Sequence, residues 1–195
     1  MKKIMFNDSV GLTKAVIVRI KTNTRRVATY EELSAPSVRW LTEGKDAGKL
    51  AIYDGEEIVA ISHFALNEVV AVTQSYEDSV KEYEDKSMYA SAARLNQLYS
   101  RCPAWTNKMF VRADEMPHHI KITNIRVEKL QDIDAKDCLR EGVIQYGNTY
   151  RFTFYGAGKT YPTSVAAFQA LIKKFDRKMW AANPYVWVYD FELLD

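Results

Sequence analysis

Strand-forming segments recur along most of this chain of 195 residues, and they constrain its fold more than any other feature. Residues 50–53 and 56–61 flank Asp54-Gly55, a pair that tolerates the positive φ of a tight hairpin turn. The apolar run at residues 69–72 predicts a buried strand, and the aromatic and β-branched residues 185–193 predict another. With helices interspersed, the pattern predicts an α+β fold, a small mixed β-barrel decorated by about three to four helices.

The segment from Ile120 to Val127 predicts a long strand that a bulge interrupts. Apolar residues alternate at Ile120 and Ile122 and again at Ile125 and Val127, but the alternation slips at Asn124. An extra residue in one strand of a pair is a β-bulge, which bends that strand. We therefore expect a bent strand in this part of the chain.

Helices are predicted between these strands. Leu12, Val16 and Ile20 recur at helical spacing, so a helix is expected to end near residues 19–21 and to lead into a loop. Three further helices are predicted, at 77–100, at 135–140 (capped by Asp134) and at 164–183 (capped by Ser164). A weak helical tendency is predicted at 30–33 and 38–41. A second hairpin is predicted at 143–154. Residues 1–195 are expected to form one domain, in which the segment at about 77–104 is a helical insertion.

Charge and cysteine content exclude several classes of protein. The formal net charge is only +2, which favours a local cationic pocket over a surface that coats long nucleic acid. Cys102 and Cys138 cannot form a disulfide framework, and no Cys/His cluster has the spacing of a zinc site. No apolar run is long enough to cross a membrane. We expect a cytoplasmic protein with reduced thiols, no metal, no cofactor and no membrane contact.

The densest group of polar side chains lies at residues 19–26, where four cations and two threonine hydroxyls fall within eight residues. The cations are Arg19, Lys21, Arg25 and Arg26. Arginine offers planar, bidentate donors that suit phosphate or a base edge. The stretch predicts the floor of a small pocket for a nucleotide or nucleoside. A salt bridge from either adjacent arginine to Glu192 or Asp190 is the structural alternative.

Several motifs follow one another in a characteristic order. Residues 21–26 read Lys-Thr-Asn-Thr-Arg-Arg, residues 68–76 form a strand that ends in polar and aromatic residues, and residues 140–142 read Arg-Glu-Gly. Residues 120–133 and 180–188 complete the series. Together these motifs resemble the ASCH domain, a branch of the PUA-like superfamily, and the last is very like the closing strand of phage-encoded members. The chain departs from the family where Arg19-Ile20 replaces a common Gly-Arg pair, and where Gln74-Ser75-Tyr76 replaces an Arg-Glu pair and an aromatic residue.

The resemblance implies a role with RNA or with modified nucleosides. One bacterial branch of the family hydrolyses the acetyl amide of N4-acetylcytidine with a lysine, a threonine and a glutamate, which correspond to Lys21, Thr24 and Glu141 here. A lysine acts as nucleophile or base only when neutral, so its pKa must lie below the ordinary value of about 10.4. Thr24 would donate to the developing oxyanion, and Glu141 would move the proton.

Five further residues are candidate ligand contacts: Arg25, Arg26, Gln74, Ser75 and Tyr76. The two arginines would bind phosphate or a base edge. Gln74 and Ser75 would hydrogen-bond a base edge, on which Tyr76 would stack. Packing at the end of a strand is the structural alternative for these last three residues.

Three functions remain open at this point. Binding of RNA or a modified nucleotide without catalysis is favoured, because a cluster of lysine and arginine is more often an anion site than a nucleophile. In this interpretation Lys21 and Arg25 bind phosphate, and Glu141 is a salt-bridge partner that orients them. Amide hydrolysis by Lys21, Thr24 and Glu141 is the second. The third is sequestration of a host protein or a nucleotide signal, with the aromatic-rich segment 103–117 as an interaction surface or a lid. Convergence of Lys21, Thr24 and Glu141 in one cleft would favour catalysis.

Overall fold

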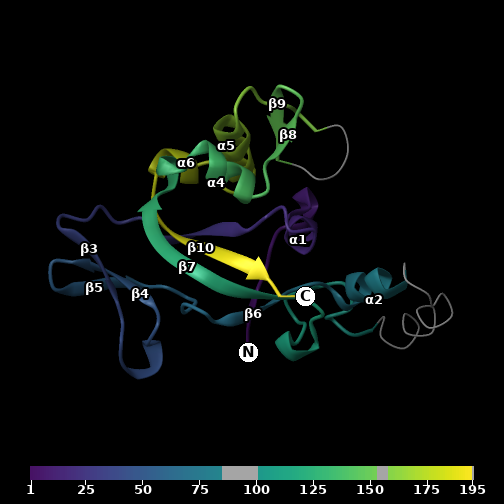
Figure 1. Cartoon of the computed structure of the whole chain (residues 1–195), viewed down its shortest axis with the longest axis horizontal. Coiled ribbons are helices and arrows are strands. Elements are labelled where there is room, and N and C mark those ends of the chain that lie inside the picture. The colour runs from purple at the N-terminus through teal and green to yellow at the C-terminus, as the bar shows by residue number, and fades with distance from the viewer. Residues whose placement is uncertain (85–100, 153–157, 195) are drawn as a thin grey trace.

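The computed structural model describes residues 1–84, 101–152 and 158–194, in which strands and helices are interspersed (Figure 1). The strands are β1 (Lys2–Ile4), β2 (Asn23–Thr29), β3 (Pro36–Trp40), β4 (Leu50–Asp54), β5 (Glu57–Ile61), β6 (Val69–Val72), β7 (His119–Lys129), β8 (Ile144–Tyr146), β9 (Thr149–Arg151) and β10 (Tyr185–Leu193). The α-helices are α1 (Leu12–Ile17), α2 (Tyr76–Glu84), α4 (Ala135–Arg140), α5 (Ser164–Phe175) and α6 (Met179–Ala182). The predicted α+β class is confirmed.

The strands form three separate sheets. The central sheet has the order β1-β6-β7-β10-β2, in which β1 and β6 are parallel and the other neighbours are antiparallel. A second sheet has the order β3-β4-β5, and β8 pairs with β9. Figure 1 shows β7 and β10 side by side in the middle of the molecule, with α4, α5 and α6 on one side of them and β3–β5 on the other.

The predicted barrel is not closed within the described residues, because β1 and β2 remain the two edges of the central sheet. A strand-forming pattern predicts that a segment is extended, but it does not determine which strand will supply the next row of hydrogen bonds. The missing closure has a consequence for the site, since it leaves β2 as an edge strand with its side chains accessible from the side.

The pairing of β7 with β10 confirms the predicted bulge. Asn124 lies opposite Asp190, but the next pair joins Ile122 to Phe191, so that Thr123 is the extra residue of β7. This is where the apolar alternation slips in the sequence. The bend curves β7 along its length, as Figure 1 shows, and carries its end toward α4.

One hydrophobic core joins the sheet to the helices. Phe168, Leu171 and Ile172 recur at helical spacing on one face of α5, and all three are buried in the same cluster as Val16 of α1 and Val188 of β10. Burial of such a side chain contributes about 1.5–3 kcal/mol relative to leaving it in water. The same face of α5 also forms one wall of the cavity described below.

The two predicted hairpins and the predicted cap of α4 are present in the structure. Gly55 has φ of 62° in the turn between β4 and β5, so the hairpin at Asp54-Gly55 is confirmed. The Asp134 side chain accepts a hydrogen bond from the amide of Asp137 and caps α4 as predicted. The second hairpin is formed by β8 and β9, although residues 153 and 154 of that prediction lie outside the described residues.

The helical tendency predicted for residues 38–41 is wrong. Val38 lies in β3 and pairs with Ile52 of β4, and residues 30–33 are not helical either. The edge of a neighbouring hairpin offers this segment hydrogen-bond partners, and tertiary context of this kind overrides a weak propensity.

The boundaries of two predicted helices are also wrong. α1 ends at Ile17, and the cations expected in a loop lie partly in β2. α5 is capped by Thr163, whose side chain accepts a hydrogen bond from Ala166, and it ends at Phe175 before the separate α6.

The predicted insertion begins as α2, but the rest of the expected helix, residues 85–100, lies outside the described residues. The segment 103–117 consists mainly of turns, with a short 3-10 helix at Ala113–Glu115. In the part of the chain that the structure describes, no helix combines the length and the apolar character needed to span a membrane.

Candidate functional site

A turn after α1 fixes the backbone of Lys21. The amides of Ile20 and Lys21 both donate to the carbonyl oxygen of Ala15, each at 2.9 Å. The amide of Thr22 then donates to the carbonyl oxygen of Arg140 at 2.8 Å. These bonds join the end of α1 to the end of α4, so two segments that are far apart in sequence are held together by their backbones.

Glu141 is placed by the same junction. It ends α4, and its amide donates to the carbonyl oxygen of Asp137 at 2.8 Å. The next residue, Gly142, has φ of 99°, where an L side chain is strained. A Cβ atom there would also lie 3.3 Å from Leu12 Cδ2 and 3.7 Å from Lys21 Cβ. Glycine therefore lets the chain turn away directly against the Lys21 segment.

Lys21 and Glu141 form a buried ion pair. The Lys21 ammonium donates to the Glu141 carbonyl oxygen at 2.9 Å and to its carboxylate oxygen Oε2. The residue is only 1% exposed, and burial lowers the pKa of Lys21 although Glu141 opposes this shift. Arg25 and Arg26 lower the pKa further through their charge. Compared with an exposed lysine, Lys21 therefore has a larger neutral fraction at any given pH.

A cavity of about 970 Å³ opens beside β2, and Lys21, Thr24 and Glu141 all line it. Its other walls come from the loop after β1, the segment 107–109, and the apolar face of α5. The Phe6 ring lies 5.7 Å from Lys21 Nζ. The structure thus brings the three residues of the predicted catalytic set to one cleft, together with Arg25 and Arg26.

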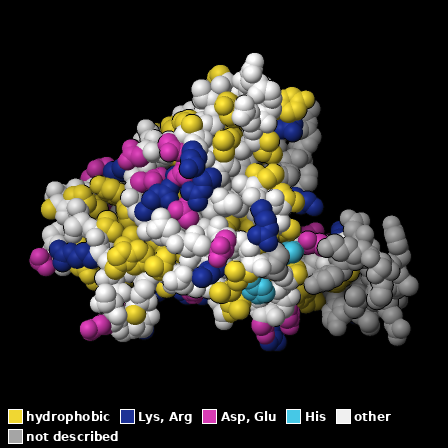
Figure 2. All heavy atoms as spheres, in the orientation of Figure 1, with side chains coloured by type: hydrophobic (Ala, Val, Ile, Leu, Met, Phe, Trp, Pro, Cys, Tyr) yellow, Lys and Arg dark blue, Asp and Glu magenta, His cyan; other side chains and the backbone are white. Residues whose placement is uncertain are grey.

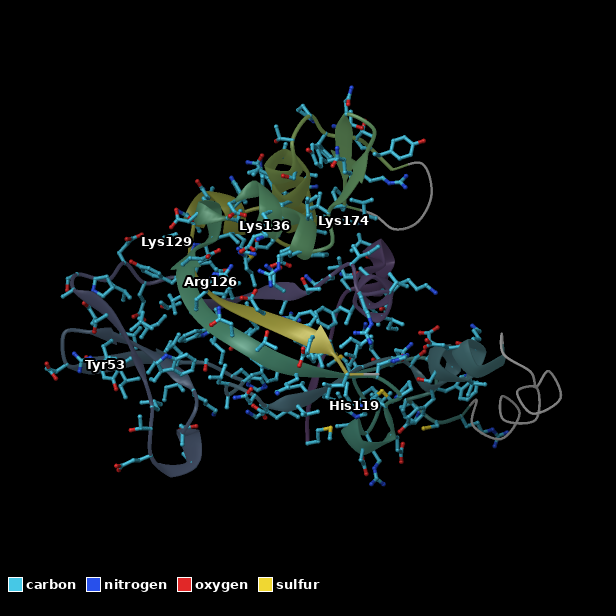
Figure 3. All side chains as sticks on the ribbon, in the orientation of Figure 1. Tyr53, His119, Arg126, Lys129, Lys136 and Lys174 are labelled. Carbon is cyan, nitrogen blue, oxygen red and sulfur yellow. The ribbon has the colours of Figure 1, made fainter. Side chains whose placement is uncertain are left out.

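Lys21 and Arg25 of the predicted cationic floor belong to an ion-pair network with as many carboxylates as cations, and of its members Lys21, Arg25 and Glu141 line the cavity. The cations are Lys21, Arg25, Arg126 and Arg140, and the carboxylates are those of Glu128, Asp137, Glu141 and Asp190. Arg126 lies on β7 beneath α4 (Figure 3), and Figure 2 shows basic and acidic side chains intermingled in that region. Within the described residues, this network of four positive and four negative groups has no formal net charge.

Arg25 is a central member of this network. Its guanidinium lies 2.6 Å from Glu128, 2.8 Å from Asp137 and 3.2 Å from Glu141. Burial lowers the pKa of Arg25, but the three carboxylates outweigh it, so the pKa is raised overall and the group stays charged. The suggested pairing of Arg25 with Glu192 or Asp190 is wrong, because α4 and β7 supply closer carboxylates.

Arg26 also lines the cavity but, unlike Arg25, is exposed. It donates to the carbonyl oxygen of Met5, and its guanidinium lies 5.9 Å from the Phe6 ring. No carboxylate among the described residues forms a salt bridge with it, so the suggested partners Glu192 and Asp190 do not apply here either. Neighbouring arginines of one strand therefore have different environments.

Gln74, Ser75 and Tyr76 do not line the cavity. β6, which they follow, is separated from β2 by β7 and β10. Ser75 Oγ accepts from the amide of Asp78 at 3.1 Å at the start of α2. Gln74 donates to Glu82 at 3.0 Å, and the Tyr76 hydroxyl donates to Glu115. The Ser75 and Tyr76 hydroxyls and the Gln74 amide nitrogen are thus engaged by the protein itself, while Gln74 Oε1 is buried without a hydrogen-bond partner among the described residues.

The sequence pattern did not point to several residues that line the cavity. Phe6 and Lys108 come from loops, and Lys174 and Phe175 come from the last turn of α5. Helical spacing relates Lys174 to Leu171 and Phe175 to Phe168 and Leu171, a signal that could have placed them on one side of α5. The segment 103–117 contributes residues 107–109, so that part of the segment borders the cavity.

Comparison of the chain with protein-family models, with curated proteins and with solved structures found no match. Within the described residues, no group of three or more His, Cys, Asp or Glu side chains is arranged to hold a metal ion. The burial of Lys21, its contact with Glu141 and the shared cavity with Thr24 are therefore the observations on which a function can be argued.

Proposed function

We propose that this protein is an ASCH-type, PUA-like hydrolase whose cavity binds a modified nucleoside or nucleotide and cleaves an amide on its base, with N4-acetylcytidine as the model substrate. The proposal is carried by one observation: Lys21, Thr24 and Glu141 line the same cavity, and the buried Lys21 amine contacts Glu141 directly. Arg19 has φ of 61°, in the left-handed region that favours glycine, which accounts for the glycine common at this position of the motif.

The chemistry follows from the positions of these groups. Neutral Lys21 takes a proton from water, whose oxygen forms the new bond to the acetyl carbon. The Thr24 hydroxyl donates to the oxyanion that develops on the carbonyl oxygen. When the bond between carbon and N4 breaks, Glu141 relays the proton to N4, and the products are acetate and cytidine. The lowered pKa of Lys21 supports this role because only the free amine accepts a proton.

Binding without turnover is the second candidate, and the ion pairs favour it. Glu141 contacts both Lys21 and Arg25, an arrangement that would equally hold the end of α4 against β2. In that case the site would retain a nucleoside without cleaving it.

The test is release of cytidine from N4-acetylcytidine, followed by chromatography. Replacing Lys21 with glutamine is expected to lower turnover by at least about 10²-fold, the scale of a lost general base. Lys14 is the matched control, because it lies exposed on α1 and does not line the cavity. Lys14→Gln should leave turnover unchanged.

Thr24→Val provides a second variant that keeps the side-chain shape in case Lys21→Gln does not fold. Loss of the hydroxyl should lower turnover by about 10²–10³-fold, the scale of a lost oxyanion donor. Wild-type levels of turnover in both variants would refute the catalytic roles of Lys21 and Thr24, and absence of turnover in the wild type would refute the hydrolase. Binding of cytidine compounds with no turnover by the wild type would favour the second candidate, and absence of both would reject the pocket as a nucleoside site.

A further inference from the structure

Positive and negative charges are balanced at the floor of the cavity, whereas its rim carries an excess of positive charge. Lys21 and Arg25 at the floor belong to a network in which carboxylates match the cations in number. At the rim, Arg26 and Lys174 are both exposed, and neither forms a salt bridge with a carboxylate among the described residues. The positive charge available to a ligand is therefore at the entrance of the cavity.

The two rim cations come from different walls. Arg26 lies on β2, and its contact with Met5 leaves the guanidinium against the loop after β1. Lys174 lies in the last turn of α5, and Figure 3 shows it in the region between α5 and α1. A third cation, Lys108, is engaged by Asp8 at 2.7 Å and adds no net charge.

An anionic group is disfavoured at the floor for a physical reason. It would have to displace Glu141 from Lys21 or Arg25, and a buried carboxylate left without a partner is strongly destabilising. At the rim, Arg26 and Lys174 are exposed and form no salt bridge within the described residues, although partial burial lowers the pKa of Arg26. A phosphate therefore gains their attraction without breaking an existing ion pair. Arginine also offers two parallel donors to a phosphate.

We infer that the preferred ligand is a nucleotide whose phosphate binds Arg26 and Lys174 at the rim, while its uncharged base extends along the apolar face of α5 toward Lys21. The inference rests on the proposed function and adds a phosphate subsite that lies outside the predicted cationic floor. A cavity of about 970 Å³ is at the upper end of the range typical of small-molecule sites, roughly 300–1,000 Å³. The phosphate belongs to a mononucleotide or to an RNA chain, and the experiments below separate these two sources.

Lys174 also has an ordinary structural explanation, since cations near a helix C-terminus complement the helix dipole. Lys173 provides the matched control for it. Both lysines are exposed in the last turn of α5, but only Lys174 lines the cavity. If the two lysines only complemented the helix dipole, replacing either one should have the same effect. If a phosphate binds at the rim, only the replacement of Lys174 should weaken its binding.

The first experiment compares KM for N4-acetylcytidine and for its 5′-monophosphate. The wild type should show a KM about tenfold lower for the monophosphate, a modest preference because both cations are solvated. Lys174→Gln should raise the KM of the monophosphate by roughly threefold and leave that of the nucleoside unchanged. Arg26→Gln should reduce the preference further, and Lys173→Gln should not alter it. Equal KM values for the two substrates in the wild type, or the same change for both in Lys174→Gln, would overturn the inference.

The second experiment does not depend on turnover. Calorimetric titration with cytidine and with cytidine 5′-monophosphate should show the same preference, and added salt should reduce it. If the enzyme proposal fails but this preference and its loss in Lys174→Gln remain, the phosphate subsite stands alone. If neither ligand binds, or both bind equally, the subsite is rejected.

Short RNAs with and without a 5′-phosphate identify the source of the phosphate. A site for mononucleotides should recognise only the terminal 5′-phosphate of an RNA. Lys174→Gln should therefore weaken binding of the 5′-phosphorylated RNA and leave binding of the other RNA unchanged. A site for internal phosphodiesters should bind both RNAs, and Lys174→Gln should weaken both. If Lys174→Gln affects neither RNA nor the mononucleotide, the inference is wrong.

Discussion

Two polar segments were predicted to be parts of one pocket, and the structure gives them different roles. In the segment 21–26, four residues line the cavity (Lys21, Thr24, Arg25 and Arg26), and Lys21 and Arg25 meet carboxylates from the end of α4 and from β7. Residues 74–76 follow β6, and their side chains bind residues of α2 and the neighbouring Glu115. Both segments are dense in hydrogen-bonding groups. Buried hydrogen-bonding groups need partners, and the fold decides whether the partner is a ligand, a helix end or another charge.

The largest effect is expected for the free energy of unfolding when a carboxylate that pairs with the first segment is removed. Glu141→Gln leaves Lys21 and Arg25 buried without their shared carboxylate, so the free energy of unfolding should fall by about 3–5 kcal/mol. Urea denaturation measures it. Glu77→Gln on α2 is the control, because Glu77 pairs with Lys81 in a more exposed position, where the loss should be about 0.5 kcal/mol or less. Similar losses in the two variants would show that burial gives the first segment no special role.

A smaller effect should appear when pH is varied. Burial alone would raise the pKa of Asp137, but the hydrogen bond from Arg25 and the charges of Arg126 and Arg140 lower it below the ordinary value near 3.8. The unfolded chain then binds this proton more readily, so the stability that Asp137 provides is complete above that ordinary value and is lost as pH falls through the lower folded pKa. Asp137→Asn should reduce the free energy of unfolding at pH 7 by about 1–3 kcal/mol and flatten its acid dependence.

The measurement is a series of urea titrations from neutral to acid pH. Thr163→Ala is the control, because the Thr163 hydroxyl caps α5 by accepting from the amide of Ala166, which does not titrate, so stability should change by a similar amount at every pH. A pH profile of Asp137→Asn that runs parallel to that of the wild type would show that this carboxylate is not specially stabilised in the folded state.

The smallest effect concerns the second segment itself. Ser75→Ala removes the hydroxyl that accepts from the Asp78 amide, and loss of such a cap costs about 1 kcal/mol. Thermal unfolding should detect this change, while KM for N4-acetylcytidine or its monophosphate should stay the same. A tenfold rise in KM would instead make this strand end part of the ligand site and remove the contrast between the two segments.

Local features of the fold could be predicted where neighbouring residues determine them. The turn at Asp54-Gly55, the cap at Asp134 and the bulge near Asn124 depend on backbone conformation and on alternation within a few residues. β3 could not be predicted in this way, since Val38 is extended through its pairing with Ile52 of a later strand. The prediction of a closed barrel is wrong for the same reason. Pairing between the edge strands of a sheet depends on segments that are far apart in the sequence.

The proposed catalytic residues of the candidate site could be predicted from the sequence, but most of the carboxylates that pair with its cations could not. Lys21, Thr24 and Glu141 could be selected from motifs, and they line one cavity. The carboxylates that neutralise Arg25 lie more than a hundred residues later in the chain, at Glu128, Asp137 and Glu141. The motifs pointed to Glu141 as a partner of Lys21 and Arg25, but no local pattern joins Glu128 or Asp137 to Arg25, so the charge balance of the network and the exposed charge of Arg26 emerge only in three dimensions.

The sequence by itself determined the α+β class, the positions of most strands and the presence of a cationic stretch after the first helix. These properties follow from side-chain periodicity, turn residues and charge, which act over a few neighbouring positions. The tertiary structure decided which cations are paired, which remain available at the rim and where the polar end of β6 lies. Those outcomes depend on the distances between segments far apart in the chain, because ion pairs and hydrogen bonds form only between groups that the fold brings into contact.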